Sequence, residues 1–214
     1  MPSVTATATA PRRRLTAARR RRQLIDVALE TFARTGFTAT TMEDIATAAG
    51  VTKPLLYQHF ASKRALYLEL IDDVTARLID ALGTAAGAET VFRLQVDAGM
   101  RAYFRFTIEN QSAIRMLYDA PHDEELARGL RSIQDAIAEF ISPLIEADMG
   151  EDHRRTLAIG VVGMTEGVTR HWLRQRAQRG SIVSDAESEE EAIMLAERVA
   201  DFAWSGLRGV HRIS

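Results

Sequence analysis

Residues 40–60 read TTMEDIATAAGVTKPLLYQHF, and this stretch decides the class of fold that the chain adopts. It contains two short segments with helical periodicity, joined by Ala48-Ala49-Gly50-Val51. Small residues allow two helices to cross closely, and glycine readily adopts the left-handed backbone conformation that a tight turn requires. The pattern predicts a helix-turn-helix, in which the second helix enters the major groove of DNA.

Signals at the helix ends support this prediction. Thr40 and Glu43 have the spacing of a capping box and predict where the first helix begins. Pro54 fits the first turn of the second helix, expected at about residues 52–59, because an N–H there has no partner within the helix. Leu56 and Phe60 are expected to face the core. The positions left more exposed are then Lys53, Leu55, Tyr57, Gln58 and His59.

The periodicity of the remaining chain is helical almost everywhere. A helix is expected between Thr16 and Phe37, where apolar residues recur at three- and four-residue steps. Ser62 has the position of an N-cap for a linking helix over about 62–82, which the segment 83–89 is expected to break. Further helices are expected near 90–109, 111–119, 123–147, 151–179 and 187–210. No segment alternates with the period of a strand, so the fold class predicted is all-α with about nine helices.

The charges of the chain are segregated along its length. Residues 1–64 carry 11 basic and 4 acidic side chains, whereas residues 65–214 carry 16 basic and 25 acidic side chains. A basic first part followed by an acidic body favours contact between the first part and a polyanion. The chain has no cysteine, which excludes disulfides and thiolate metal sites and indicates the cytoplasm. No uncharged stretch reaches the roughly 20 residues of a membrane span.

The first 16 residues consist mainly of Ala, Thr, Pro and Arg and are interpreted as a flexible basic tail. A mitochondrial transit peptide, which is also rich in arginine and poor in acidic residues, remains an alternative. The arginines at 12–14 and 19–22 are either solvated or add affinity for phosphates or the minor groove, as basic arms do elsewhere.

The helix-turn-helix resembles a known family closely. The residues Thr40-Thr41-Met42-Glu43-Asp44-Ile45-Ala46, then Ala49-Gly50-Val51-Thr52, Leu56-Tyr57-Gln58-His59-Phe60, Ser62-Lys63-Arg64 and Leu66 are similar to the amino-terminal DNA-binding domain of the TetR family of repressors. The match covers about residues 20–68. Residues 69–214 resemble the family only in the number and length of their helices.

The resemblance implies which residues contact DNA. Thr40 and Thr41 lie at a helix N-terminus, where hydroxyl and free N–H groups suit a phosphate. Lys53 can donate to guanine O6 or N7, and the two residues after it can pack on thymine methyl groups. Backbone contacts are implied for Tyr57, His59 and Lys63. The complete set implied is Thr40, Thr41, Thr52, Lys53, Pro54, Leu55, Tyr57, His59 and Lys63.

A purely structural role is the alternative for several of these residues. Tyr57 is also suited to cover the core of the small domain. The His59 imidazole is equally suited to be solvated or to pack against neighbouring side chains. Thr40 is a helix-cap candidate, a role that does not exclude a DNA contact. Leu55 carries no hydrogen-bonding group, so it reads little base sequence.

Aromatic and methionine side chains gather in the larger domain, where such stripes usually form the core. Members of the family commonly bind a small ligand there, and the resemblance implies a cavity between the helices near 90–118 and the helix 151–179. Its expected lining is Met100, Tyr103, Phe104, Met116, Met164, His171 and Trp172. The polar groups suited to orient a mostly apolar ligand are Tyr103, Glu109, Tyr118, Glu166 and His171.

The last two long helices, about 151–179 and 187–210, have the features of an interface. Three glycines on one helix cost helix propensity, roughly 1 kcal/mol each against alanine, which favours a packing reason for them. The resemblance implies that two such helices from each subunit form a four-helix bundle; an intramolecular core is the alternative. The expected interface residues are Gly160, Gly163, Gly167, Val199 and Phe202.

Other classes of function are disfavoured. The five histidines are scattered without a His-Glu-x-x-His pattern, so we expect no enzyme, no cofactor and no metal. A metal site is the alternative for Asp119, His122, Asp123 and Glu124, but a run of this kind before a helix is usually explained by capping and solvation. A sequence-independent coating protein would bind DNA or RNA without site preference, and a dimerisation scaffold would bind no DNA.

The sequence therefore predicts a regulator of two domains after the tail at 1–16. Residues 17–66 form the DNA-binding domain, and residues 67–214 form the ligand-binding and dimerisation domain. The function implied by the resemblance is a homodimeric, ligand-responsive repressor in the cytoplasm. It binds a palindromic double-stranded operator and releases it when an unknown small molecule binds the larger domain.

Overall fold

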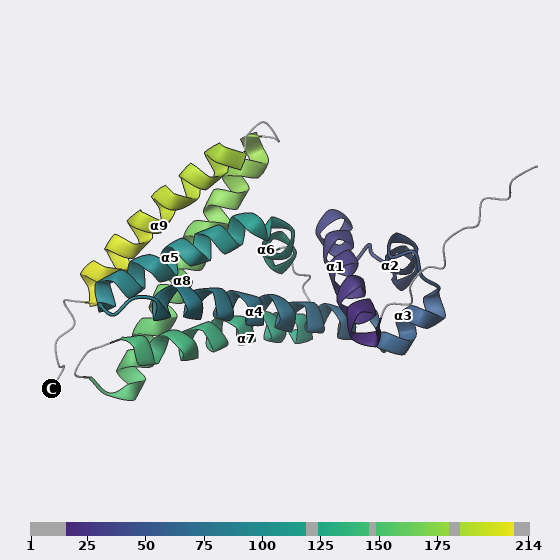
Figure 1. The fold of residues 1–214 in the computed structure, drawn as a ribbon, viewed down its shortest axis with the longest axis horizontal. Coiled ribbons are helices and arrows are strands. Elements are labelled where there is room, and N and C mark those ends of the chain that lie inside the picture. Colours follow the sequence, from purple (N-terminus) through teal and green to yellow (C-terminus); the bar gives the residue numbers. More distant parts are fainter. Residues whose placement is uncertain (1–15, 119–123, 146–148, 180–184, 208–214) are drawn as a thin grey trace, which may run out of the picture.

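The fold was analysed in a computed structural model, which describes residues 16–118, 124–145, 149–179 and 185–207. Within these ranges the chain forms nine α-helices and one short 3-10 helix, with no strand, and the predicted all-α class is confirmed (Figure 1). The elements are α1 (Ala17–Thr35), α2 (Met42–Ala48), α3 (Lys53–His59), α4 (Lys63–Gly87), α5 (Phe92–Glu109), α6 (Gln111–Tyr118), α7 (Glu124–Ile141), η1 (Ser142–Leu144), α8 (Glu151–Arg179) and α9 (Asp185–Leu207).

Helices α1 to α3 and the first turns of α4 enclose a small core. Leu24, Phe32, Ile45 and Leu56 are fully or almost fully buried in it. Phe32 and Phe37 stack with their ring centroids 5.7 Å apart, and the ring of Tyr67 meets both edge-on. Each buried side chain of this size contributes about 1.5–3 kcal/mol, which explains how a domain this small is held together.

Helix α4 takes part in two cores. Its first half supplies Leu66 and Leu70 to the small core, and its second half supplies Val74 and Leu78 to the core of the larger domain. Helix α6 also reaches the small core, through Met116, whose backbone carbonyl accepts a buried hydrogen bond of 3.0 Å from the Tyr67 hydroxyl. The two domains are therefore joined by a continuous helix and by α6 against α1.

Two predicted helix ends are wrong. The linking helix continues to Gly87 instead of breaking at 83, because the ring of Phe140 packs 3.5 Å from where a Gly83 Cβ would lie and Ala86 is buried. The helix expected over 123–147 ends at Ile141, where a 3-10 turn containing Pro143 follows. The break expected over 180–188 is too long, because α9 begins at Asp185, and Thr16, expected in the tail at 1–16, is the N-cap of α1. Pro121 and residues 1–15 and 180–184 lie outside the described residues.

The larger domain is built around α4, α5 and α7, with α8 and α9 packed on them. Helix α5 lies along α9 on one side and along α4 on the other, and α7 lies along both α4 and α8 (Figure 1). Of the helices in the described ranges, none is both long and apolar enough to cross a membrane.

Candidate DNA-binding surface and ligand cavity

The turn between α2 and α3 is a tight one. Gly50 has φ +63°, the left-handed conformation that glycine adopts at little cost, and the Val51 N–H closes the turn on the Ala46 carbonyl at 2.9 Å. This geometry agrees with the predicted helix-turn-helix.

The capping box of α2 is shifted by one residue from the prediction. The N-cap is Thr41, whose hydroxyl accepts from the Asp44 N–H at 3.2 Å while the Asp44 carboxylate accepts from the Thr41 N–H at 2.8 Å. The Thr41 hydroxyl also donates to the Asp44 carboxylate at 2.7 Å. This hydrogen bond, followed by the one from the Thr41 N–H, lowers the pKa of Asp44. The predicted pair Thr40 and Glu43 is wrong because Thr40 is only 1% exposed and lies one residue before the cap.

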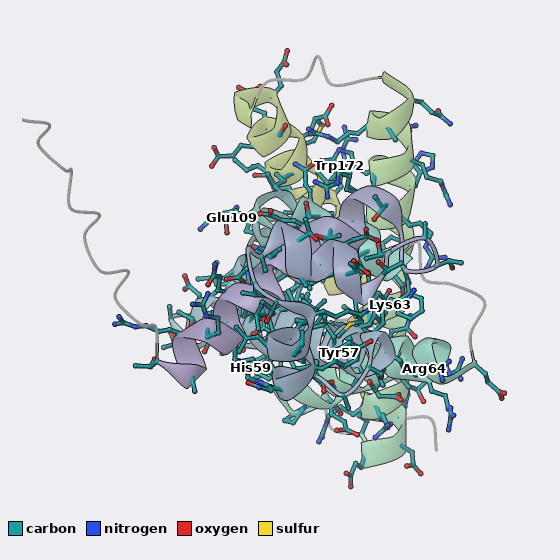
Figure 2. All side chains as sticks on the ribbon, turned by 90° about the vertical axis from the view of Figure 1, so that its right-hand side faces the viewer. Tyr57, His59, Lys63, Arg64, Glu109 and Trp172 are labelled. Carbon is teal, nitrogen blue, oxygen red and sulfur yellow. The ribbon has the colours of Figure 1, made fainter. Side chains whose placement is uncertain are left out.

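Helix α3 presents a polar face to solvent. Leu56 and Phe60 are buried as expected, while Tyr57 is 45% exposed. Thr52 is the N-cap without a side-chain hydrogen bond, so its hydroxyl is available to a ligand. Figure 2 views this end of the molecule and shows Tyr57, His59 and Lys63 together there. The exposed face consists of Thr52, Lys53, Pro54, Tyr57 and Gln58, with Leu55 and His59 half-buried at its border.

The Lys53 ammonium, which was expected to read a base, lies 3.5 Å from the Glu43 carboxylate of α2. Both side chains are largely exposed, so the pair contributes at most about 1 kcal/mol and competes weakly with DNA.

Lys63 has an internal role that sequence reasoning missed. Its ammonium donates to the carbonyls of Phe37 and Thr40 at 2.7 Å each and to that of Thr38 at 3.3 Å, and it lies 4.4 Å from the centre of the Phe37 ring. Its partial burial lowers the pKa of Lys63. All three ammonium hydrogens are thereby used, so in this conformation Lys63 has no donor left for a phosphate.

The Thr40 hydroxyl is likewise used inside the domain. It donates to the Gly36 carbonyl at 2.7 Å and shares a hydrogen bond of 2.6 Å with the Thr35 hydroxyl. Of the predicted DNA contacts, Thr40 and Lys63 are therefore the two whose polar groups are bonded within the domain and at least partly buried. The Thr41 hydroxyl is bonded to Asp44, but at an exposed position that a ligand can reach.

Two arginines interpreted as part of a basic arm are also used within the fold. The Arg21 guanidinium binds both oxygens of Glu69, donates to the His59 carbonyl at 2.6 Å and lies 4.5 Å from the centre of the Phe60 ring. Arg22 pairs with Asp73 and Asp26. Arg21 thus holds the C-terminus of α3 against α1 and α4, and nothing in its sequence position distinguishes it from its neighbours.

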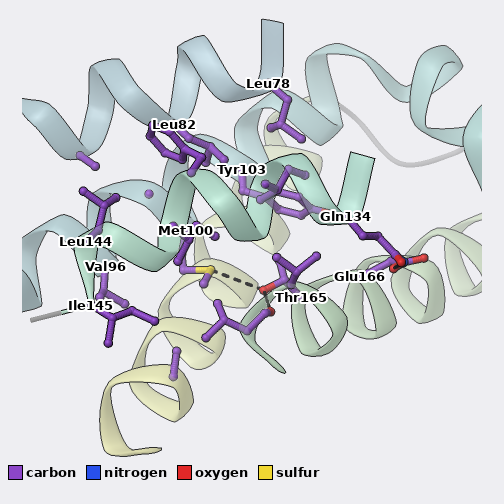
Figure 3. A pocket seen from close by; sticks show the side chains of 18 of the residues that line it. Leu78, Leu82, Val96, Met100, Tyr103, Gln134, Leu144, Ile145, Thr165 and Glu166 are labelled. Carbon is purple, nitrogen blue, oxygen red and sulfur yellow. Dashed lines mark hydrogen bonds between the residues drawn. The ribbon is translucent and has the colours of Figure 1, made fainter. Parts of the chain in front are cut away.

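The larger domain contains a cavity of about 490 Å³, lined by residues of α4, α5, α6, α7, α8, α9 and η1. Of the residues expected to line it, Met100 and Tyr103 do so. The Thr165 hydroxyl lies 3.8 Å from the Met100 sulfur, drawn as a dashed line in Figure 3. Gly99 also borders the space, and a Cβ at this position would meet no atom within 4 Å. The lining is predominantly aliphatic and aromatic.

The other residues expected in the cavity lie elsewhere. Phe104 and Met164 pack toward α9, and Met116 belongs to the small core. His171 is exposed, and the Trp172 indole donates to Glu191 of α9 at 2.8 Å. The prediction that these five line the cavity is wrong, because the helix faces that carry them are turned toward neighbouring helices or solvent. Helix α7, which supplies much of the real lining, was not anticipated as part of it.

Helices α8 and α9 each have an exposed face that carries apolar or small residues. Gly160, Gly163 and Gly167 are exposed, and a Cβ at any of them would meet no atom within 4 Å. Phe202 is 71% exposed. Val199 is a correction to the expected interface, because it is buried against α5 within the subunit.

The described residues hold no cluster of three or more His, Asp or Glu side chains that could bind a metal ion. The run from Asp119 to Asp123 lies outside them.

The fold and the exposed polar face of α3 define a helix-turn-helix DNA-binding protein. A sequence profile described as "Bacterial regulatory proteins, tetR family" matches residues 24–70. The chain is 31% identical to the transcriptional activator FasR of Mycolicibacterium smegmatis over 195 residues, which cover 89% of this chain and 84% of that protein. The chain belongs to the TetR family and is a DNA-binding transcriptional regulator.

Solved structures show the same fold. A TetR-like regulator from Rhodococcus sp. RHA1 superposes with a TM-score of 0.70 at 26% identity, over 92% of this chain and 100% of that one. The regulator FadR from Bacillus subtilis, solved in complex with stearoyl-CoA, superposes with a TM-score of 0.69 at 14% identity, over 89% of this chain and 99% of that one. At that identity the second comparison concerns the fold alone.

Proposed function

We propose that the protein is a homodimeric repressor in the cytoplasm that releases a palindromic operator when a small molecule enters the cavity. The observation that carries this proposal is the double role of α4. Leu78 and Leu82 line the cavity, and the same helix supplies Leu66 and Leu70 to the core on which α3 rests. A ligand that displaces α4 therefore changes the position of the recognition helix.

The proposed division of labour follows the two cores. Residues 17–66 bind DNA, and residues 67–214 bind the ligand and the second subunit, without catalysis. The proposed DNA contacts are the predicted set without the two groups used internally, namely Thr41, Thr52, Lys53, Pro54, Leu55, Tyr57 and His59. Gln58 joins them because it is exposed on the same face of α3.

Dimerisation through α8 and α9 is supported by their exposed faces. The three glycines of α8 leave room for a helix to approach closely, and α9 carries three exposed large hydrophobic side chains, Ile193, Met194 and Phe202. Two recognition helices held about 34–36 Å apart can enter successive major grooves, and this spacing requires a dimer.

The cavity supports a mostly apolar effector. Its lining comes from six α-helices and η1 and is largely aliphatic, and its volume of about 490 Å³ lies within the range of small-molecule sites. The stearoyl-CoA bound by the Bacillus subtilis relative has a long apolar chain, which is the kind of group that such a cavity accommodates.

The test is selection of bound fragments from genomic DNA with the purified protein. We expect one palindromic site preferred by orders of magnitude, weaker binding to every sequence in Tyr57→Ala, and an altered base preference in Lys53→Ala. Binding without site preference would contradict the proposal. A reporter gene behind the selected site distinguishes repression from activation, which the name of the Mycolicibacterium relative makes the second candidate.

The effector response is tested with the variant Gly99→Trp, which fills the cavity from α5. We expect it to reduce release of DNA by compounds that stabilise the wild-type protein thermally, with DNA affinity unchanged. Unaltered release in this variant would show that the cavity is not the effector site.

A further inference from the structure

The cavity has a polar end that lies between α7 and α8. Three of its lining residues are exposed at the surface, and all three are polar: Arg131 and Gln134 of α7, and Arg170 of α8. The cavity therefore meets solvent at this end. Figure 3 shows Gln134 and Glu166 at one end of the space and the apolar Val96, Leu144 and Ile145 at the other.

The carboxylate at the polar end is already satisfied. One oxygen of Glu166 accepts from the Gln134 amide and the other from the Arg170 guanidinium, at 2.5 Å. Gln134 and Glu166 thus bridge α7 to α8 beside the opening. The Arg170 guanidinium also balances the charge of this carboxylate, so Glu166 does not leave an unpaired negative charge for a cationic ligand.

Arg131 differs from its neighbours at this end. In the part of the chain that the structure describes, its guanidinium makes no hydrogen bond, ion pair or ring contact. Two guanidinium groups therefore line this end against one carboxylate, and the cavity's mouth carries a net positive charge. Guanidinium groups bind carboxylates and phosphates through paired hydrogen bonds.

We propose that Arg131, assisted by Arg170, binds the anionic group of an amphiphilic effector whose apolar chain fills the rest of the cavity. This inference rests on the proposed effector role of the cavity and adds the charge and position of the head group. The shared chemistry is a long alkyl chain that ends in an anionic group, supplied either by a free fatty acid or by a phosphate-bearing acyl thioester such as an acyl-coenzyme A.

The test compares four ligands that share a chain of twelve carbons: dodecanoate, dodecanoyl-coenzyme A, dodecanol and dodecylamine. Each is titrated calorimetrically into the intact protein below the concentration at which it aggregates. The variants are Arg131→Gln and Arg131→Glu. The matched control is Arg128→Gln, because Arg128 is exposed one turn earlier on α7 and does not line the cavity. Operator binding without ligand is measured in the same preparations.

We expect dodecanoate or dodecanoyl-coenzyme A to bind more tightly than dodecanol and dodecylamine, and the tighter of the two identifies the source of the anion. Arg131→Gln should weaken the affinity for the anionic ligand about fivefold to tenfold and leave the affinity for dodecanol unchanged. The effect is modest because Arg131 would pair with the head group at the protein surface. Arg131→Glu should reverse the preference toward dodecylamine.

Equal affinity for all four ligands, or equal loss in Arg128→Gln, would overturn the head-group assignment and leave the cavity as an apolar site. Failure of all four ligands to bind, with operator binding intact, would overturn the assignment without affecting the DNA-binding function. If the wild-type protein bound no operator, this result would instead contradict the proposed function itself.

Discussion

The ammonium group of Lys63 stabilises the loop between α1 and α2. It donates to three carbonyls of this loop, which would otherwise lack partners within the domain. The same loop positions Thr41, whose hydroxyl caps α2. At the scale of single residues, the DNA-binding domain thus depends on polar groups that stabilise its shape and on a separate set that faces outward.

Replacement of Lys63 tests this internal role. Lys63→Gln should lower the free energy of unfolding by about 1–2 kcal/mol, because charge-assisted hydrogen bonds to partly buried carbonyls are lost. The measurement is urea unfolding, and the control is Arg34→Gln at an exposed position of α1, expected within about 0.5 kcal/mol of wild type. If the variant were as stable as wild type and its DNA affinity depended less on salt, by the amount expected for one phosphate contact, Lys63 would be assigned to DNA binding instead.

The Asp44 carboxylate should make stability depend on pH. Because its pKa is lowered in the folded protein, its contribution is complete above the unfolded value of 3.8 and is lost as the pH falls through the lower folded value. Asp44→Asn should therefore be less stable than wild type at pH 7, and the difference should shrink below about pH 4. The control is Asp72→Asn, at an exposed position of α4. A difference that is constant from pH 7 to pH 3 would contradict the assignment.

At the scale of elements, the recognition helix is positioned from both ends. Gly50 sets the direction in which α3 leaves the turn, and Arg21 fixes its last carbonyl against α1 and α4. The side chain of Leu56 provides the buried contact between these points. A helix of two turns is too short to be stable alone, so its orientation depends on these tertiary contacts.

Gly50→Ala should lower the free energy of unfolding by about 1–2 kcal/mol and weaken DNA binding, because alanine at φ +63° is strained although no atom obstructs its Cβ. The matched control is Gly87→Ala at the end of α4, where space is equally open and φ is not positive. Chemical unfolding and DNA titration measure both effects. Equal responses of the two variants would show that the turn does not need the left-handed conformation.

At the scale of the whole molecule, the exposed faces of α8 and α9 are the surface expected to pair two subunits. Within the subunit α9 packs chiefly on α5, which leaves Phe202 and Met194 toward solvent. Residues of the same two helices line the cavity, so the proposed dimer interface and the proposed ligand site share these helices.

Phe202→Glu should convert the dimer to a monomer at micromolar concentration without loss of helix content, because the side chain has no core contact to lose. Sedimentation velocity and circular dichroism measure these properties, and operator affinity should fall because one half-site is then bound alone. The control is Leu94→Glu, an exposed leucine on α5. A wild-type protein that sediments as a monomer would contradict the pairing.

Local sequence was sufficient for the helices and for the face of α3. The periodicity around Leu56 and Phe60 predicted which residues are buried, and Gly50 marked the turn, because both depend on neighbours within a few residues. The ends at Gly87 and Ile141 were missed. The first depends on Phe140, more than fifty residues away in sequence, which no local pattern contains.

The sequence by itself determined the all-helical class, the helix-turn-helix and the outward face of its second helix. Only the tertiary structure decided that the Lys63 and Arg21 side chains make hydrogen bonds within the domain, that Met116 belongs to the small core, and that α7 lines the cavity. The physical reason is that a helical side chain's environment depends on which helices surround it. Those contacts join residues far apart in the chain, whereas helix formation depends on neighbours three and four positions away.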